Sequence, residues 1–198
     1  MFEVNHMVVL AGPPACGKST ILTRIADGEL PDLPAKLGID DFPAWTQLAA
    51  KELKAVDSPR LDKVIYHYDF LRQWRQAQGG DVPDYIDDPT LRIFEHARDL
   101  TFVTCWTQPT ELLERVNART GRRLFSTMRS MRLLRTLKIR RRLRRQQSLY
   151  GDRAAMTARY EQWLAFCARF QARAHYILDT TPANPTVHPL SDWATIRA

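Results

Sequence analysis

Nine residues near the amino terminus, GPPACGKST, have the types and spacing of a phosphate-binding loop. A glycine, four residues and then Gly-Lys-Ser form a loop whose backbone N–H groups converge on phosphate oxygens. Lys18 is expected to reach the β and γ phosphates of a nucleotide, and the Ser19 hydroxyl to ligate Mg²⁺. The predicted nucleotide-binding residues, called here the phosphate loop, are Gly12, Pro13, Pro14, Ala15, Cys16, Gly17, Lys18, Ser19 and Thr20.

The segments on either side of the phosphate loop favour this interpretation. Residues 6–11 form a short apolar run rich in valine, which is typical of a buried parallel strand. Residues 19–26 place apolar side chains at helical spacing, and Gly28 and Pro31 then end the helix. A strand, a loop and a helix in this order are what a phosphate site needs, because the helix amino terminus adds positive potential.

Acidic residues follow two further predicted strands. Residues 35–41 are predicted to form a strand that ends at Asp40 and Asp41, and residues 63–69 form another that ends at Asp69. Phosphoryl transfer to an alcohol needs a carboxylate close to the hydroxyl, and Asp40 is our first candidate for this base, with Asp41 as the second. Asp41 is equally suited to capping a helix at Pro43. Asp69 is predicted either to hold Mg²⁺ or to contact the substrate.

A strongly basic segment stands between Arg122 and Arg145. It contains ten arginines and Lys138 without an acid, so it carries +11 while the whole chain is +7 and the remainder is −4. Its arginines suit a lid over phosphates, and its apolar residues at intervals of three or four suit a solvated amphipathic helix. The same stripe also suits docking to nucleic acid or anionic lipid.

The order of elements predicts an α/β fold. Strands at 6–11, 35–41, 63–69, 100–106 and 176–179 alternate with helical segments, one of which runs through Trp45, Leu48 and Leu53. This alternation predicts a three-layer fold with about five parallel strands and helices on both faces. Residues 180–189 are predicted to be a proline-rich loop before a short terminal helix. A single domain is expected over residues 1–198, with 120–150 as a basic helical lid.

Composition favours an ordinary globular protein of the reducing cytoplasm. Hydrophobic residues make up 44% and charged residues 26%, and no run approaches the length of a membrane span. Residues 1–10 lack the basic start of a secretion signal. The three cysteines, Cys16, Cys105 and Cys167, show neither a disulfide framework nor zinc-ligand spacing.

Four stretches together resemble the P-loop kinase branch, which includes shikimate, gluconate and nucleoside monophosphate kinases. They are GPPACGKST, LGIDDF, CWTQPTELLERVNARTGRR and ILDTT. Within this branch, these stretches most resemble those of chloramphenicol phosphotransferase-like and zeta-toxin-like enzymes. The resemblance implies that Asp40 lies beside the substrate hydroxyl and that residues 180–185 hold adenine. It also implies a lid whose arginines close over the phosphates: Arg119, Arg122 and Arg123.

These observations predict an ATP- and Mg²⁺-dependent kinase that phosphorylates a hydroxyl of a small molecule, such as a sugar, a nucleotide sugar or an antibiotic-like alcohol. Lys18, Asp40 and the three lid arginines are its expected catalytic residues, and Ser19 and Asp69 its expected metal ligands. A polynucleotide 5′-hydroxyl kinase is an alternative, since the arginine stripe suits a nucleic-acid backbone. A nucleotide-gated module that docks through its basic helix is another.

Overall fold

The computed structural model describes residues 3–49, 52, 60–71, 84–129, 144, 147–148 and 150–197, and excludes the side chains of 120–129. Within this part a six-stranded sheet has the order β2-β3-β1-β4-β5-β6. The first five strands are parallel, and β6 pairs antiparallel with β5. The strands are β1 (Glu3–Ala11), β2 (Thr46–Ala49), β3 (Arg60–Tyr68), β4 (Ala97–Trp106), β5 (Ala174–Asp179) and β6 (Thr186–Pro189).

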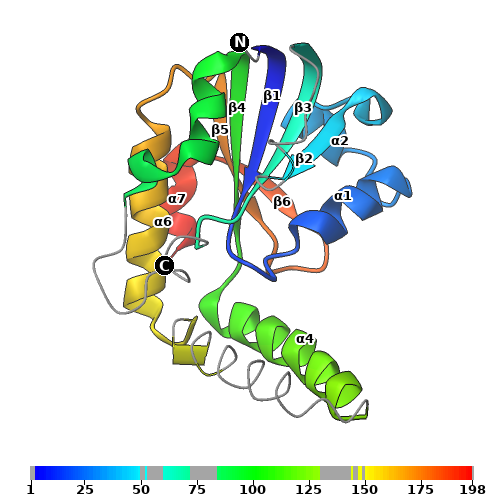
Figure 1. The fold of residues 1–198 in the computed structure, drawn as a ribbon, viewed down its shortest axis with the longest axis vertical. Coiled ribbons are helices and arrows are strands. Elements are labelled where there is room, and N and C mark those ends of the chain that lie inside the picture. The colour runs from blue at the N-terminus through cyan, green and yellow to red at the C-terminus, as the bar shows by residue number, and fades with distance from the viewer. Residues whose placement is uncertain are drawn as a thin grey trace.

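Helices cover both faces of the sheet, so the predicted three-layer α/β architecture is confirmed (Figure 1). α1 and α2 pack on one face, α6 and η4 pack on the other, and α4 extends away from the carboxyl edge of the strands. The helices are α1 (Lys18–Ala26), α2 (Leu33–Leu37), η1 (Phe42–Ala44), η3 (Tyr85–Asp87), η4 (Pro89–His96), α4 (Pro109–Arg129), α6 (Arg153–Cys167), η5 (Leu190–Asp192) and α7 (Trp193–Ile196).

The segment between α1 and β3 differs from its sequence-based prediction. Residues 33–37 form the short helix α2 instead of entering a strand, because Pro34 suits the first helical turn and Gly38, with φ of 71°, ends it. The second strand is instead β2, in the stretch where a helix was predicted. β2 has only four residues and pairs only with β3 at the edge of the sheet, so its periodicity was too short to recognise.

The carboxyl-terminal part also contains an unpredicted strand. Thr186–Pro189 adds to β5 as the edge strand β6, inside the stretch expected to be a loop. A proline is tolerated at this position because an edge strand leaves one side of its backbone without a strand partner. The predicted terminal helix is present as α7.

The side chains between the sheet and α6 are mostly aromatic. Trp163 of α6 stacks on Tyr68 of β3 with ring centroids 5.1 Å apart and meets Phe102 of β4 edge to face at 6.2 Å. The Trp163 indole also donates a hydrogen bond to the Thr104 hydroxyl (3.0 Å), which contacts His175 Nε2 at 2.9 Å. Polar groups inside an apolar layer must find their hydrogen-bond partners, so they favour one position of a helix on a sheet over others. These contacts therefore fix the position of α6 along the sheet.

A second buried hydrogen bond connects β3 with η4. The Tyr68 hydroxyl donates to Asp88 Oδ2 at 3.0 Å, while Asp88 Oδ1 accepts from the backbone N–H and hydroxyl of Thr90 at the start of η4. Asp88 is only 6% exposed. A buried carboxylate must be satisfied by donors, so this contact holds η4 against the sheet.

We predict that Tyr68→Phe lowers the free energy of unfolding by about 1–3 kcal/mol, because it removes a donor from a buried carboxylate at almost constant shape. Urea denaturation measures the change. Tyr176→Phe is the matched control, since the half-buried Tyr176 hydroxyl makes no hydrogen bond to described residues. Equal stabilities for the two variants would contradict the role given to this contact.

Candidate functional site

The phosphate loop begins where β1 ends, in the middle of the sheet. β1 lies between β3 and β4, and the Gly12 N–H donates to the Tyr68 carbonyl at the end of β3 (3.1 Å). After β1 the chain first adds β2 and β3 on one side of β1 within the sheet, and it then adds β4 on the other side of β1. Ligands in open parallel sheets bind where the strand order reverses in this way, beyond the carboxyl ends of the strands.

The backbone of the loop has the curvature that anion binding requires. Ala15 and Gly17 both have positive φ, 71° and 94°. Ala15 is the only such non-glycine residue in the described part of the chain. Left-handed residues next to right-handed ones turn successive N–H groups into one concavity. Gly17 is also the N-cap of α1, so the positive end of that helix faces the same concavity.

Lys18 lies across the concavity. Its ammonium donates hydrogen bonds to the carbonyls of Gly12 (2.6 Å) and Pro13 (3.0 Å). The side chain is therefore already folded back over the loop, where a phosphate held by the N–H groups would meet it. Of the other predicted binding residues, Pro13 is buried, Pro14 is half-buried and Thr20 is exposed.

Two cysteines lie beneath the loop. Cys16 and Cys105 are fully buried and their side chains share a hydrogen bond. Burial acts to raise the pKa of the Cys16 thiol, but the Cys105 hydrogen bond and the charge of Lys18, whose Nζ is 3.5 Å from Sγ, lower the pKa to about 6. The pKa of Cys105 is raised by burial and by its neighbour. The Cys16 thiol and the Lys18 ammonium are therefore electrostatically linked beneath the loop.

A pocket of about 250 Å³ adjoins the loop on the α1 side. Arg115 of α4 spans its rim, because its guanidinium donates to the Thr180 carbonyl (2.7 Å) and to Glu111 (2.8 Å). Arg24 of α1 donates to the Ala183 carbonyl at 2.8 Å and so fixes the loop after β5. The lining residues are Ala15, Gly17, Thr20, Ile21, Arg24, Arg115, Thr180, Pro182, Ala183 and Pro185.

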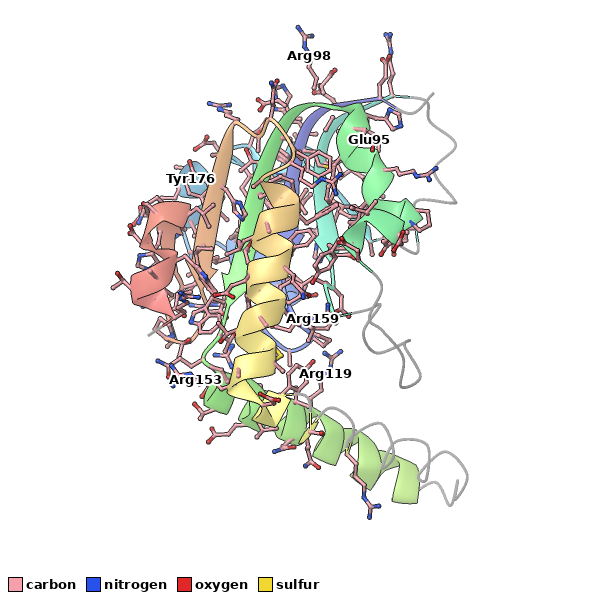
Figure 2. The ribbon with its side chains drawn as sticks, turned by 90° about the vertical axis from the view of Figure 1, so that its left-hand side faces the viewer. Glu95, Arg98, Arg119, Arg153, Arg159 and Tyr176 are labelled. Carbon is pink, nitrogen blue, oxygen red and sulfur yellow. The ribbon has the colours of Figure 1, made fainter. Side chains whose placement is uncertain are left out.

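Sequence reasoning missed Arg115, although it lies inside one of the quoted stretches. We looked for a phosphate-facing arginine after the helix, at Arg119, Arg122 and Arg123. The structure shows Arg119 exposed on α4, one turn beyond Arg115 (Figure 2). The side chains of Arg122 and Arg123, and most of the predicted lid at 120–150, lie outside the described residues. Glu111 and Arg115 are four residues apart, a spacing that allows an ion pair on one helix face. This spacing is the sequence feature that could have drawn attention to Arg115.

Ser19 and Asp69, the two predicted metal ligands, lie at the start of α1 and directly after β3. Ser19 is exposed in the first turn of α1. Asp69 follows the last residue of β3, next to the Tyr68 carbonyl that holds Gly12, and its Oδ1 accepts from the Leu71 N–H (3.1 Å). Hydroxyl and carboxylate oxygens suit Mg²⁺. Among the described residues no group of three or more His, Cys, Asp or Glu is arranged to hold a metal ion.

Asp40 and Asp41 do not reach this edge, and the prediction that they end a strand there is wrong. Asp41 bonds to Lys63, and Lys63 pairs in register with His6 near the start of β1. Tyr68, the last residue of β3, is five residues after Lys63, so the Lys63 backbone lies about 17 Å from the carboxyl edge at the rise of a strand, and its partner Asp41 lies toward the opposite edge. The hydrogen bond from Lys63 also lowers the pKa of Asp41. The cause of the error is α2, which takes up the residues assigned to the strand.

Glu52 and His67 occupy the edge instead. Ala49 ends β2 beside His67, and the Ala49 N–H donates to Glu52 Oε2 at 2.8 Å. His67 Nε2 is buried and has no hydrogen-bond partner among the described residues. Burial lowers the pKa of His67, and the charge of Lys18 lowers it further while Glu52 opposes the shift. His67 is therefore neutral at neutral pH and lies within electrostatic range of both Lys18 and Glu52.

No family model, curated protein or solved structure matches this chain. No helix among the described residues is long and apolar enough to cross a membrane.

We predict that Gly12→Ala destabilises the protein by about 1–3 kcal/mol through overpacking. An added Cβ would stand 2.7 Å from Cys16 Sγ, 3.0 Å from Cys105 Cβ and 3.1 Å from the Cys105 carbonyl oxygen. Gly151→Ala is the control, because nothing lies within 4 Å of its Cβ position. Chemical denaturation of both variants measures the difference, and a Gly12→Ala protein as stable as Gly151→Ala would show that the loop does not need this contact.

Proposed function

We propose that the protein is an ATP- and Mg²⁺-dependent kinase that transfers the γ-phosphoryl group to a hydroxyl of a small molecule. The observation that carries the proposal is the curled loop at the end of the central strand, with Lys18 folded over it. Positioning and charge neutralisation provide most of the catalysis of phosphoryl transfer. The loop N–H groups, the start of α1 and the Lys18 ammonium offer both.

The pocket beside the loop supports a nucleotide as the phosphate donor. Its volume of about 250 Å³ suits a heterocyclic base, and its wall after β5 contains Pro182 and Pro185, whose rings offer flat apolar surface. Arg115 lies between this pocket and the phosphate loop, since its Nη1 is 3.9 Å from the position of a Cβ on Gly17. A guanidinium at that point is suited to phosphate oxygens. We therefore assign to Arg115 the clamp expected of Arg119.

Ser19 and Asp69 are the residues that would hold Mg²⁺, Ser19 directly and Asp69 directly or through water. When bound, the metal ion neutralises charge that develops on the transferring phosphoryl group. Asp69 is placed for this because the Gly12 N–H bonds to the residue before it. The hydrogen bond between Gly12 and Tyr68 therefore holds the phosphate loop next to the Asp69 backbone.

Glu52 is our candidate for the general base in place of Asp40. In the transfer, a bond forms between the acceptor oxygen and the γ phosphorus, the bond to the β–γ bridging oxygen breaks, and the hydroxyl proton passes to the carboxylate of Glu52. The turn after β2 holds Glu52 at the carboxyl edge through the Ala49 N–H. His67, neutral and with a buried Nε2, faces the same region. A positioned base contributes about 10²–10⁴-fold in rate.

No observation favours the two alternatives, a polynucleotide kinase or a gated docking module. Both depend on the arginine-rich segment, most of which lies outside the described residues. The phosphate loop is common to all three functions.

Lys18→Ala is expected to reduce phosphoryl transfer by at least 10²-fold and leave the fold intact, because it removes the charge that meets the phosphates. The assay uses γ-labelled ATP, Mg²⁺ and a panel of small alcohols and short oligonucleotides. Lys36→Ala, an exposed lysine of α2, is the control for loss of one positive charge. Transfer by Lys18→Ala at the wild-type rate would refute the proposal, and label found only on oligonucleotides would favour the polynucleotide kinase.

Glu52→Gln is expected to lower the transfer rate by about 10²-fold without weakening ATP binding, because the amide accepts no proton. Asp40→Asn makes the matched change at the residue that the structure places away from the loop, and we expect it to keep wild-type turnover. Steady-state kinetics and a fluorescent ATP analogue separate turnover from binding. The reverse result, with Asp40→Asn inactive and Glu52→Gln active, would restore the sequence-based assignment.

A further inference from the structure

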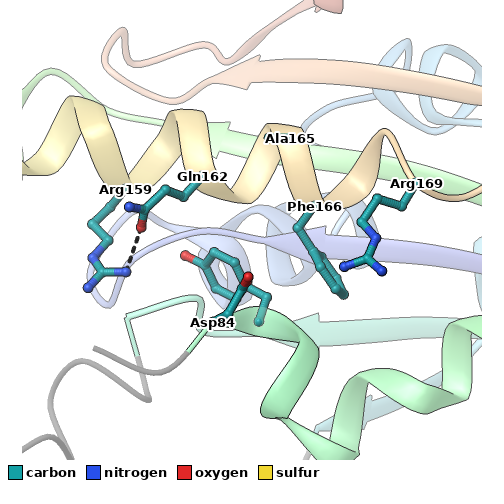
Figure 3. A pocket seen from close by; sticks show the side chains of 7 residues that line it. Asp84, Arg159, Gln162, Ala165, Phe166 and Arg169 are labelled. Carbon is teal, nitrogen blue, oxygen red and sulfur yellow. Dashed lines mark hydrogen bonds between the residues drawn. The ribbon is translucent and has the colours of Figure 1, made fainter. Parts of the chain in front are cut away.

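A second cleft, of about 400 Å³, lies between η3 and α6 on the opposite face of the sheet from α1 (Figure 3). Its size is in the range of ligand sites. α6 contributes most of the wall, and Asp84 and Tyr85 contribute the rest. The lining residues are Asp84, Tyr85, Arg159, Gln162, Ala165, Phe166 and Arg169.

The floor of the cleft is aromatic and rigid. Tyr85 is 3% exposed and Phe166 is 7% exposed, and their ring centroids are 5.6 Å apart. The Tyr85 hydroxyl is already engaged, because it donates to the Phe70 carbonyl at 3.2 Å. These two side chains therefore give the cleft an apolar floor whose hydroxyl is already satisfied, which suits the apolar body of a ligand.

The ends of the cleft are cationic. Arg159 of α6 and Arg169, two residues beyond the end of that helix, lie on either side of Phe166 (Figure 3). Arg159 Nη1 donates to Gln162 Oε1 at 2.6 Å, which holds its guanidinium at the rim, and no hydrogen bond or ion pair of the Arg169 guanidinium is found among the described residues. Asp84 is the single carboxylate among the described residues of the lining, and these residues together carry a formal charge of +1. A guanidinium fork is suited to a carboxylate or a phosphate.

The Arg159 end of this cleft is level with the phosphate loop. The neighbouring Tyr160 hydroxyl donates to the Cys105 carbonyl at 3.0 Å, and the same carbonyl oxygen is 3.1 Å from the Cβ position of Gly12. Phe70, which accepts from Tyr85, directly follows Asp69. The cleft therefore starts at the carboxyl edge, on the β3 side of the loop, while the pocket proposed for the nucleotide base lies on the β5 side.

We propose that this cleft is the acceptor site and that the acceptor is a flat alcohol bearing a carboxylate or phosphate, an inference that rests on the proposed kinase function. The apolar body lies over Tyr85 and Phe166, the anionic group binds to Arg169 at the far end, and the hydroxyl points past Arg159 to the carboxyl edge. The cationic rim makes an anionic acceptor bind more tightly than its neutral counterpart. Such selectivity does not require turnover to be measured.

The test compares two probes that differ only in charge, 4-(hydroxymethyl)benzoate and 4-(hydroxymethyl)benzamide. NMR titration of the full chain measures their affinities. We expect the benzoate to bind about tenfold more tightly, as a charge-assisted hydrogen bond allows, and Arg169→Gln to remove the difference. Arg173→Gln, an exposed arginine that pairs with Asp99 outside the cleft, should keep it. Equal affinities, no binding of either probe, or a difference that survives Arg169→Gln would overturn the assignment.

Transfer from γ-labelled ATP separates this inference from the function on which it rests. Label on the benzoate that is lost in Arg169→Gln, with ATP binding unchanged, would support both. Label on neutral alcohols alone would overturn the cleft assignment and keep the kinase. Benzoate selectivity in wild type and Lys18→Ala alike, with no label on any alcohol, would overturn the kinase and with it the role of the cleft as an acceptor site.

Discussion

The close approach of Gly12 to Cys105 is the contact on which the site depends. A residue without a side chain allows the end of β1 to lie against the Cys105 backbone and above the Cys16 sulfur, while the Gly12 N–H bonds to the end of β3. The loop is therefore attached to both neighbours of the central strand before it turns. Because the loop leads directly into α1, this attachment also fixes the start of the helix and the side chain of Lys18.

The charge of Lys18 connects several buried groups. With the hydrogen bond from Cys105 it lowers the pKa of Cys16 beneath the loop, and with burial it lowers the pKa of His67 on β3. The aromatic layer under α6 adds a mechanical connection, since Tyr160 bonds to the Cys105 carbonyl against which Gly12 packs. Electrostatics and packing thus bring the phosphate loop, the β3 edge and the α6 cleft to one region of the fold.

The predictions that succeeded were local. The strand and the helix on either side of the phosphate loop show clear periodicity, so β1 and α1 were recognisable and are confirmed. The binding of phosphate by the loop stays a prediction. The predictions that failed concern short or edge elements. α2 has five residues and β2 has four, too few for periodicity to separate helix from strand. Asp40 was misplaced with them. Glu52 and Arg115 were missed because each reaches the site from a distant part of the chain.

The sequence by itself determined the α/β class, the phosphate loop and the position of Asp69 at the end of a strand, because each follows from residues that are neighbours in the chain. Only the tertiary structure decided which other side chains join them. Glu52 arrives through the pairing of β2 with β3, and Arg115 through the course of α4 toward the loop after β5. The α6 cleft depends on buried contacts of Trp163 and Tyr160 with β4. Pairing and packing between distant segments leave no local pattern, so no spacing in the sequence could have shown them.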